Sequence, residues 1–316
     1  MPILAILDTP TSTPVVDNGP TCRLDFAALD GSELIVCDSE VWINRRGTTG
    51  IDLTPRELVT DRIIGLPGGR IAQINDLPKD VVTPLMVRPE SGQCWDMRAQ
   101  IARLRTVLDY RRVDYAANDG HADIIATTDE GVTRRLRVAY VDGAEGSYGD
   151  RGRGWASFVL RWIAVDPYWR GGEWTRPLVG VDTTPPFLST SGAHPWPRTL
   201  APSVAIGANM PVDVQGDVPS APVLDIVGPA TTTTVTSPSG MSVTIGAIGA
   251  GDSFRLDTRR RVSVTLNGAD AWGLLGASPR WAPLAPGATT ISVVATDATS
   301  ATRVRVWGDS LWESPW

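Results

Sequence analysis

The chain is 316 residues long and carries a formal net charge of −6, with 29 basic and 35 acidic residues. This length exceeds the roughly 100–200 residues of an average domain and favours two domains. The acidic balance argues against a protein whose main task is to hold nucleic acid by its phosphates, because such domains are usually basic. The 31 Gly and 25 Pro residues are typical of many turns between strands, and fall far short of a disordered or collagen-like composition.

Cysteine usage and the N-terminal stretch bear on where the chain folds. Cys22, Cys37 and Cys94 are too few and too far apart for a disulfide framework, and none is part of a CxxC pair. The first eight residues lack the basic region and the length of a secretory signal. No apolar run approaches the ~20 residues of a membrane span. We therefore expect synthesis in the cytoplasm and no membrane insertion.

The first half of the chain alternates between apolar and polar residues with a period of two, as around Leu136 and Val138, which predicts half-buried strands. Residues 94–108 break this pattern with apolar residues at helical spacing, so we expect one amphipathic helix on a sheet. Its predicted buried face comprises Met97, Ile101, Leu104 and Leu108.

Turn signals divide the following segment into a hairpin or meander. Residues 118–120 read Asn-Asp-Gly and residues 129–131 read Asp-Glu-Gly, both suited to tight turns that need a positive φ. A β-rich tract over residues 155–165 then ends at Pro167, because proline cannot continue a central strand. We expect the first domain, a β-sandwich or barrel-like unit with the one helix, to span residues 1–169.

Residues 170–217 are rich in Pro, Gly, Thr and Ser, which predicts a connector without continuous regular structure. Short β-prone runs then recur with no helical pattern between them, and Asn267-Gly268 and Pro286-Gly287 mark turns. This spacing predicts a β-sandwich over residues 218–316. The expected strands are 223–227, 241–248, 253–257, 261–266, 290–296 and 301–307.

Residues with catalytic or metal-binding chemistry are sparse. His121 lies in a turn-rich stretch and His194 in the proline-rich connector, and neither has a second histidine at metal-ligand spacing. The glycines of residues 246–251 lack the lysine and the strand-to-helix setting of a phosphate-binding loop, so they predict a β-turn. No GxSxG motif is present. We expect no catalytic residue, no metal site and no cofactor. The aspartates of the turns fit turn chemistry as well as they fit calcium; these are Asp119, Asp123 and Asp129.

Tryptophan is unusually frequent, with 12 residues. Exposed aromatic rings can stack on sugars, but tryptophan is also enriched in cores and protein interfaces. Trp281 and Trp307 lie at positions that suit a scaffold role. Trp272 and Trp312 lie near turns or the terminus and are the candidates for glycan stacking, so a carbohydrate-binding module that adheres to cell-wall polysaccharide remains an alternative. A glycan-cleaving enzyme would need paired carboxylates, which the sequence does not single out.

An ordered series of short motifs runs through the chain. Its most specific members are residues 216–222, 226–230, 249–258, 281–287 and 304–307, after the Asp-Pro-Tyr-Trp of residues 166–169. In this order they resemble the distal tail proteins, also called minor tail or phage tail family proteins, of long-tailed siphophages. The final Trp312–Trp316 departs from that pattern.

The resemblance implies a structural virion protein and not an enzyme. It implies a homo-hexameric ring, built by the N-terminal domain, at the distal end of a long non-contractile tail, with a galectin-like C-terminal β-sandwich outside the ring. The implied partners are the tail tube protein, the tail hub or tip protein and the tape measure protein, and the implied location is the tail tip of the virion, after synthesis in the host cytoplasm. Closed rings also cover sheet edges, which fits two β-rich domains.

Overall fold

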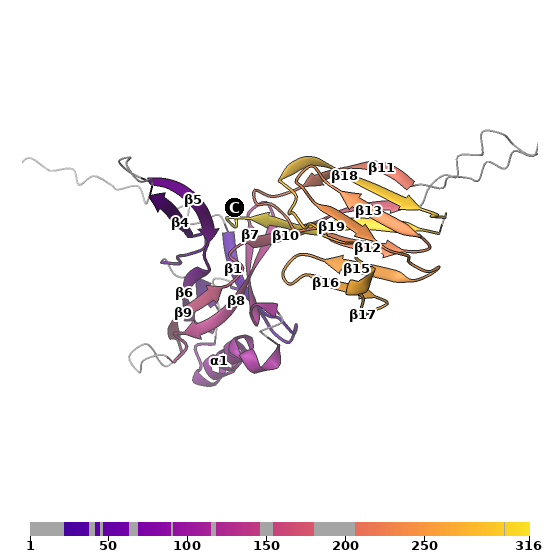
Figure 1. The fold of residues 1–316 in the computed structure, drawn as a ribbon. Helices are drawn as coiled ribbons and strands as arrows, with labels where there is room; N and C mark the ends of the chain where they lie inside the picture. Colours follow the sequence, from indigo (N-terminus) through magenta and orange to yellow (C-terminus); the bar gives the residue numbers. More distant parts are fainter. Residues whose placement is uncertain are drawn as a thin grey trace, which may run out of the picture.

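The computed structural model describes residues 22–37, 42–44, 47–62, 69–89, 91–114, 118–145, 154–179, 206–299 and 301–316. Within these ranges the chain consists mainly of antiparallel strands, with one α-helix, which confirms the predicted fold class. One long sheet runs through the molecule and contributes strands to two large hydrophobic cores, one in the N-terminal part and one in the C-terminal part (Figure 1). The residue limits proposed for the two domains remain a prediction.

The N-terminal part folds into a bent sheet. Its elements are β1 (Cys22–Ala28), β2 (Leu34–Ile35), β3 (Trp42–Asn44), β4 (Arg56–Arg62), β5 (Gly69–Asp76), β6 (Lys79–Val87), α1 (Cys94–Leu108), β7 (Ala122–Thr128), β8 (Thr133–Asp142) and β9 (Ala156–Ala164). Strand β8 changes partners halfway along its length: up to Val138 it pairs with β7, and from Ala139 it pairs with β9. This exchange turns the sheet around the first core, and the predicted hairpin is the pair β7–β8.

Aromatic packing fixes the centre of this first core. The rings of Phe26 on β1 and Trp162 on β9 are stacked, with centroids 5.7 Å apart and an interplanar angle of 12°. The indole N–H of Trp162 donates to Oγ1 of Thr83 at 2.9 Å. Since a buried indole N–H needs a partner, this bond makes the fully buried position of Trp162 tolerable.

Helix α1 begins and ends at the predicted residues, Cys94 and Leu108. Met97, Leu104 and Leu108 are buried as expected, and Ile101 is partly buried against the same core. Val107 is also buried, which the prediction missed although it lies three residues after Leu104 on the same face.

The C-terminal part is a sandwich of two sheets. Its strands are β10 (Trp169–Val179), β11 (Ile206–Val214), β12 (Val223–Val227), β13 (Thr232–Thr236), β14 (Ser242–Ile245), β15 (Ser253–Asp257), β16 (Ser263–Leu266), β17 (Ala269–Asp270), β18 (Gly287–Thr296) and β19 (Arg303–Trp312). One sheet has the order β17-β16-β15-β12-β19-β10 and the other the order β11-β18-β13-β14. Alternate residues of each strand point inward, as Ile291, Val293 and Ala295 do on β18.

Two predicted turns of the sandwich are confirmed. Asn267 and Gly268 both have a positive φ, of 51° and 82°, and they join β16 to β17 as a two-residue hairpin loop. The glycine-rich stretch 246–251 closes a turn before β15, in which the N–H of Asp252 donates to the carbonyl of Gly249 at 3.2 Å.

The segment expected to be a connector contains strands at both of its described ends. Strand β10 pairs with β19 from Trp169↔Trp312 to Val179↔Arg303, and β11 pairs with β18. Each strand contains a proline, Pro177 or Pro211, and prolines were taken as a sign against regular structure. Among the described residues, β10 beyond Arg170 pairs only with β19, and β11 pairs only with β18, so each proline lies beside a free strand edge, where it is tolerated.

Strand β10 joins the two parts. Trp169 is buried in the first core and Trp174, five residues later, in the second. A register shift between Arg170 and Glu173 accommodates Gly171-Gly172. A Cβ at Gly171 would lie 2.9 Å from the indole nitrogen of Trp312, so a larger residue here would displace the Trp312 ring.

Candidate assembly surfaces

The histidines and turn aspartates are not assembled into a reactive cluster among the described residues. His121 is buried, and burial lowers the pKa of its ring below the ordinary value. Asp119 and Asp123 form separate ion pairs with Arg260 and Arg137, at 3.0 and 2.8 Å. Within the described ranges no group of three or more His, Cys, Asp or Glu side chains could hold a metal ion. His194 lies outside the described residues.

The one α-helix of the described ranges has 15 residues. No described helix combines the length and the apolar character that crossing a bilayer requires.

The hairpin β4–β5 projects from the N-terminal part as a two-stranded ribbon (Figure 1). Leu58 and Ile74 face each other across its strands, and more than half of each side chain is exposed, 55% and 56%. Ile71 is exposed to 55% as well. An isolated two-stranded ribbon is marginally stable in water, and exposed apolar side chains on it indicate a contact surface.

Polar contacts fix the base of this hairpin. Arg56 forms ion pairs with Asp76, at 3.1 Å, and with Glu313, and the hydroxyl of Tyr168 donates to Asp76. Burial and the neighbouring Asp76 raise the pKa of the Tyr168 hydroxyl well above its ordinary value. The hydroxyl therefore stays protonated and acts as a donor. The ribbon thus leaves the domain from an anchored base.

Trp312–Trp316, which we call the C-terminal segment, docks onto the N-terminal part. Nζ of Lys79 donates to the carbonyl of Glu313 at 2.8 Å, and Arg134 donates to the carbonyls of Ser314 and Trp316 at 2.8 and 3.1 Å. Lys79 and Arg134 are both buried. Residues that the sequence separated into two domains are therefore joined through main-chain acceptors.

Lys79 is the only lysine in the chain, whose other 28 basic residues are arginines. That exception was the one signal in the sequence that could have singled it out. A compact ammonium group fits a buried position beside a single carbonyl, whereas a planar guanidinium has five donors to satisfy. Nothing in the sequence distinguishes Arg134 from the other arginines in this way.

The structure places the two candidate glycan-stacking tryptophans in different settings. Trp312 is half-buried beside the first core, and the guanidinium carbon of Arg134 lies 3.8 Å from its ring centroid. One face of that ring is therefore already covered. Trp272 lies in the 3-10 turn Trp272–Leu274 after β17 and is exposed to 46%. The structure does not bring the two rings together, and sugar stacking on Trp272 stays an alternative hypothesis.

The other two tryptophans considered are part of the scaffold. Trp307 is buried, and its indole N–H donates to Oδ2 of Asp225 at 2.6 Å. Three guanidinium carbons lie 4.5–5.3 Å from its ring centroid, those of Arg255, Arg259 and Arg305. Trp281 packs against the second core. These positions agree with the scaffold role expected for both.

Comparison with known proteins finds a similar architecture among solved phage proteins. No family model matches the sequence, and no curated protein matches it. The crystal structure of the SPP1 Dit protein, described as a paradigm of hub adsorption apparatus in Gram-positive infecting phages, is similar with a TM-score of 0.59 at 17% identity. The alignment covers 90% of this chain and 98% of SPP1 Dit.

Two structures of the phage P2 baseplate in its activated conformation are also similar. The one with Ca has a TM-score of 0.49 and covers 90% of this chain and 97% of that one; the one with Sr has a TM-score of 0.46 and covers 89% and 99%. Both are 9% identical to this chain. The likeness to SPP1 Dit shows that this chain has the Dit fold across both of its parts, and confirms the fold expected from the distal tail protein resemblance.

Proposed function

We propose that this chain is a structural, non-enzymatic subunit of a phage tail, located in the virion, that forms a homo-hexameric ring at the distal end of a long non-contractile tail. The observation that carries the proposal is the likeness to SPP1 Dit over 90% of this chain and 98% of that one, together with the ordered sequence motifs. In this role the ring joins the tail tube protein to the tail hub or tip protein, and the tape measure protein is a further partner.

The hairpin β4–β5 supports self-association through the N-terminal domain. Both of its strands have one unpaired edge, and its apolar side chains lie exposed. Unpaired edges and apolar patches of this kind are covered in closed assemblies. We assign this hairpin to the contact with the neighbouring copy of the chain.

The test is the mass of the full chain in solution, measured by light scattering. A ring has six times the 33.8 kDa of the chain. Introducing a charge on the hairpin with Leu58→Asp should shift the mass towards that of the monomer. The matched control is Val294→Asp, because Val294 is an exposed apolar residue on β18 of the sandwich.

Each result has a distinct meaning. A chain that stays monomeric at high concentration and does not bind tail-tube protein would show that the ring assignment is wrong. A ring that withstands Leu58→Asp would leave the function standing and remove the hairpin from the interface.

Adhesion to host cell-wall polysaccharide is the second candidate function. The observation that favours it is the exposed ring of Trp272. It is compatible with a ring subunit, since the sandwich could bind sugar while the N-terminal domain assembles.

A further inference from the structure

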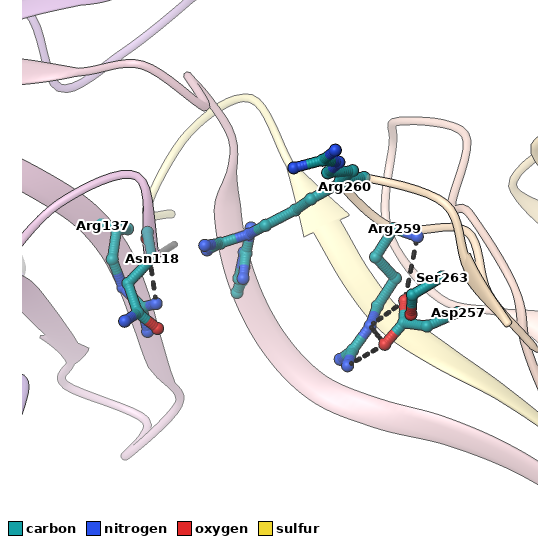
Figure 2. A pocket seen from close by; sticks show the side chains of 8 residues that line it. Asn118, Arg137, Asp257, Arg259, Arg260 and Ser263 are labelled. Atoms are coloured by element: carbon teal, nitrogen blue, oxygen red, sulfur yellow. Dashed lines mark hydrogen bonds and ion pairs between the residues drawn. The ribbon is translucent and has the colours of Figure 1, made fainter. Parts of the chain in front are cut away.

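A cavity of about 420 Å³ lies where the N-terminal part meets the loop between β15 and β16 of the sandwich. Every side chain that lines it is polar or charged. Figure 2 shows the labelled lining residues: Arg137 and Asn118 lie on one side, Asp257, Arg259 and Ser263 on the other, and Arg260 between them. Because every lining side chain ends in a polar or charged group, the cavity suits a polar ligand, and its volume is in the range of small-molecule sites.

The charge of the lining is strongly asymmetric. Five arginines line the cavity against one carboxylate, that of Asp257. This carboxylate is already engaged by Arg259, whose Nη2 lies 2.8 Å from Oδ2 and whose Nε donates to Oδ1 at 3.2 Å. Asp257 therefore neutralises one guanidinium. The others are Arg137, Arg170, Arg260 and Arg261.

Carboxylates outside the lining hold most of these arginines in place. Arg137 pairs with Asp123 at 2.8 Å, and Arg260 with Asp119 at 3.0 Å. Arg170 pairs with Asp166 and lies 3.9 Å from Asp309. These pairs orient the guanidinium groups while leaving further N–H donors of each fork for a ligand. No ion pair of Arg261 is found within the described part of the chain.

Like-charge repulsion acts between the two walls. Burial lowers the pKa of Arg260 below its ordinary value, and the nearby guanidinium groups of Arg170 and Arg137 lower it further, against an opposing effect of Asp119. Arg259 also pairs with Asp309, at 3.3 Å, so neighbouring aspartates offset most of the positive charge, and Arg261 is the lining arginine for which the described residues show no ion pair. The protein as a whole carries a charge of −6. The overall charge repels anions, so an anion that binds here must be held by this local arrangement.

We propose that this cavity is a binding site for a ligand with two linked phosphoryl groups. Planar guanidinium forks match phosphoryl oxygens in bidentate geometry, and arginines on two facing walls suit two phosphoryl groups better than one. The arginines are oriented before binding, which lowers the cost of ordering them. This site is independent of the proposed ring, because it uses none of the hairpin residues.

Calorimetric titration of the full chain with pyrophosphate tests the proposal. We expect saturable binding, weakened about tenfold or more by Arg261→Gln and by Arg260→Gln, since each removes charge-assisted hydrogen bonds. Arg161→Gln is the matched control, because Arg161 is a half-exposed arginine of β9, away from the cavity lining, and lies 3.7 and 3.8 Å from Asp80 and Asp142. It should leave the affinity unchanged.

Three further titrants identify the chemistry recognised. Inorganic phosphate and glycerol 3-phosphate, with one phosphoryl group each, should bind more weakly than pyrophosphate, and citrate should test a carboxylate ligand of comparable charge. Absence of saturable heat at millimolar pyrophosphate would overturn the site. An equal loss in Arg161→Gln, or tighter binding of citrate, would overturn it as well. If the Arg260→Gln variant unfolds because the ion pair with Asp119 is lost, the pyrophosphate affinity of the Arg261→Gln variant tests the proposal by itself.

Discussion

Nζ of Lys79, at the start of β6, donates a hydrogen bond to the carbonyl of Glu313 across 234 residues of sequence. The only lysine of the chain thus contacts the C-terminal segment, which follows directly from strand β19 of the sandwich. Together with Arg134 it satisfies three main-chain acceptors of the C-terminal segment. This arrangement couples the two parts of the molecule and leads to the first two predictions.

Deleting residues 313–316 should destabilise the N-terminal part. The deletion leaves Nζ of Lys79 and the guanidinium of Arg134 buried without their acceptors, which should lower the free energy of unfolding by more than about 2 kcal/mol. Chemical denaturation followed by tryptophan fluorescence measures the change. Trp316→Ala is the control, because that side chain is half-exposed and its carbonyl still accepts from Arg134. Equal stability of the deleted and intact chains would show that these contacts are dispensable.

Stability should rise with pH on the alkaline side because of Lys79. Burial lowers the pKa of Lys79 from 10.5 to about 8. Nearby carboxylates oppose this shift, and Glu313 has the largest opposing effect. Between these two values the unfolded chain binds a proton that the folded chain does not, so the free energy of unfolding increases as the pH rises through this window. Below about pH 8 both states are protonated and this contribution is constant.

The measurement is denaturant unfolding at several pH values between about 7 and about 10, on the natural chain and on Lys79→Met. Methionine has a similar length and does not titrate. The alkaline rise should be smaller in the variant. Parallel pH profiles for the two proteins would assign the rise to other groups.

The buried face of α1 should not tolerate a charge. Leu104 is 1% exposed, and Leu104→Asp places an unpaired carboxylate in the first core, which should cost more than about 3 kcal/mol or prevent folding. Ala102→Asp is the matched control two residues away, because Ala102 is exposed on the same helix and its substitution should cost less than about 1 kcal/mol. Thermal unfolding followed by circular dichroism compares them. A stable Leu104→Asp variant would contradict the packing described here.

The sandwich should show no saturable binding to purified host cell-wall polysaccharide. Trp312 is covered by Arg134 on one face, and Trp272 is exposed without a second candidate ring beside it, whereas sugar sites usually combine stacking with polar contacts. Binding is measured by calorimetry on the full chain. Micromolar binding that disappears in Trp272→Ala, with an unchanged circular dichroism spectrum, would favour the carbohydrate-binding function.

The sequence predicted those helices and strands that are determined by the pattern of neighbouring residues. The helix limits Cys94 and Leu108 and the strands β12 and β15 are confirmed residue for residue, because periodicity is a property of neighbouring residues. Strands β10 and β11 were missed, since their prolines are compatible with strand structure only at a sheet edge, which is a property of the assembled sheet.

The surfaces that carry the proposals depend on tertiary contacts and could not be predicted. Arg137 and Arg260 are 123 residues apart in the sequence numbering, and nothing in either local stretch indicates that they line one cavity. Lys79 stands out in the sequence as the only lysine, but nothing there indicates that its partner is Glu313. The hairpin β4–β5 was not predicted, although residues 67–69 read Pro-Gly-Gly, a turn signal.

The pairing of β10 with β19 has a mechanical consequence. These two antiparallel strands are hydrogen-bonded from Trp169↔Trp312 to Val179↔Arg303 and run from one core into the other. A pull that separates the sandwich from the N-terminal part along the strand direction therefore acts on two paired backbones, each of which enters both parts. A force applied to one part is transmitted to the other along these two strands, and the hydrogen bonds between them oppose the separation of the two parts.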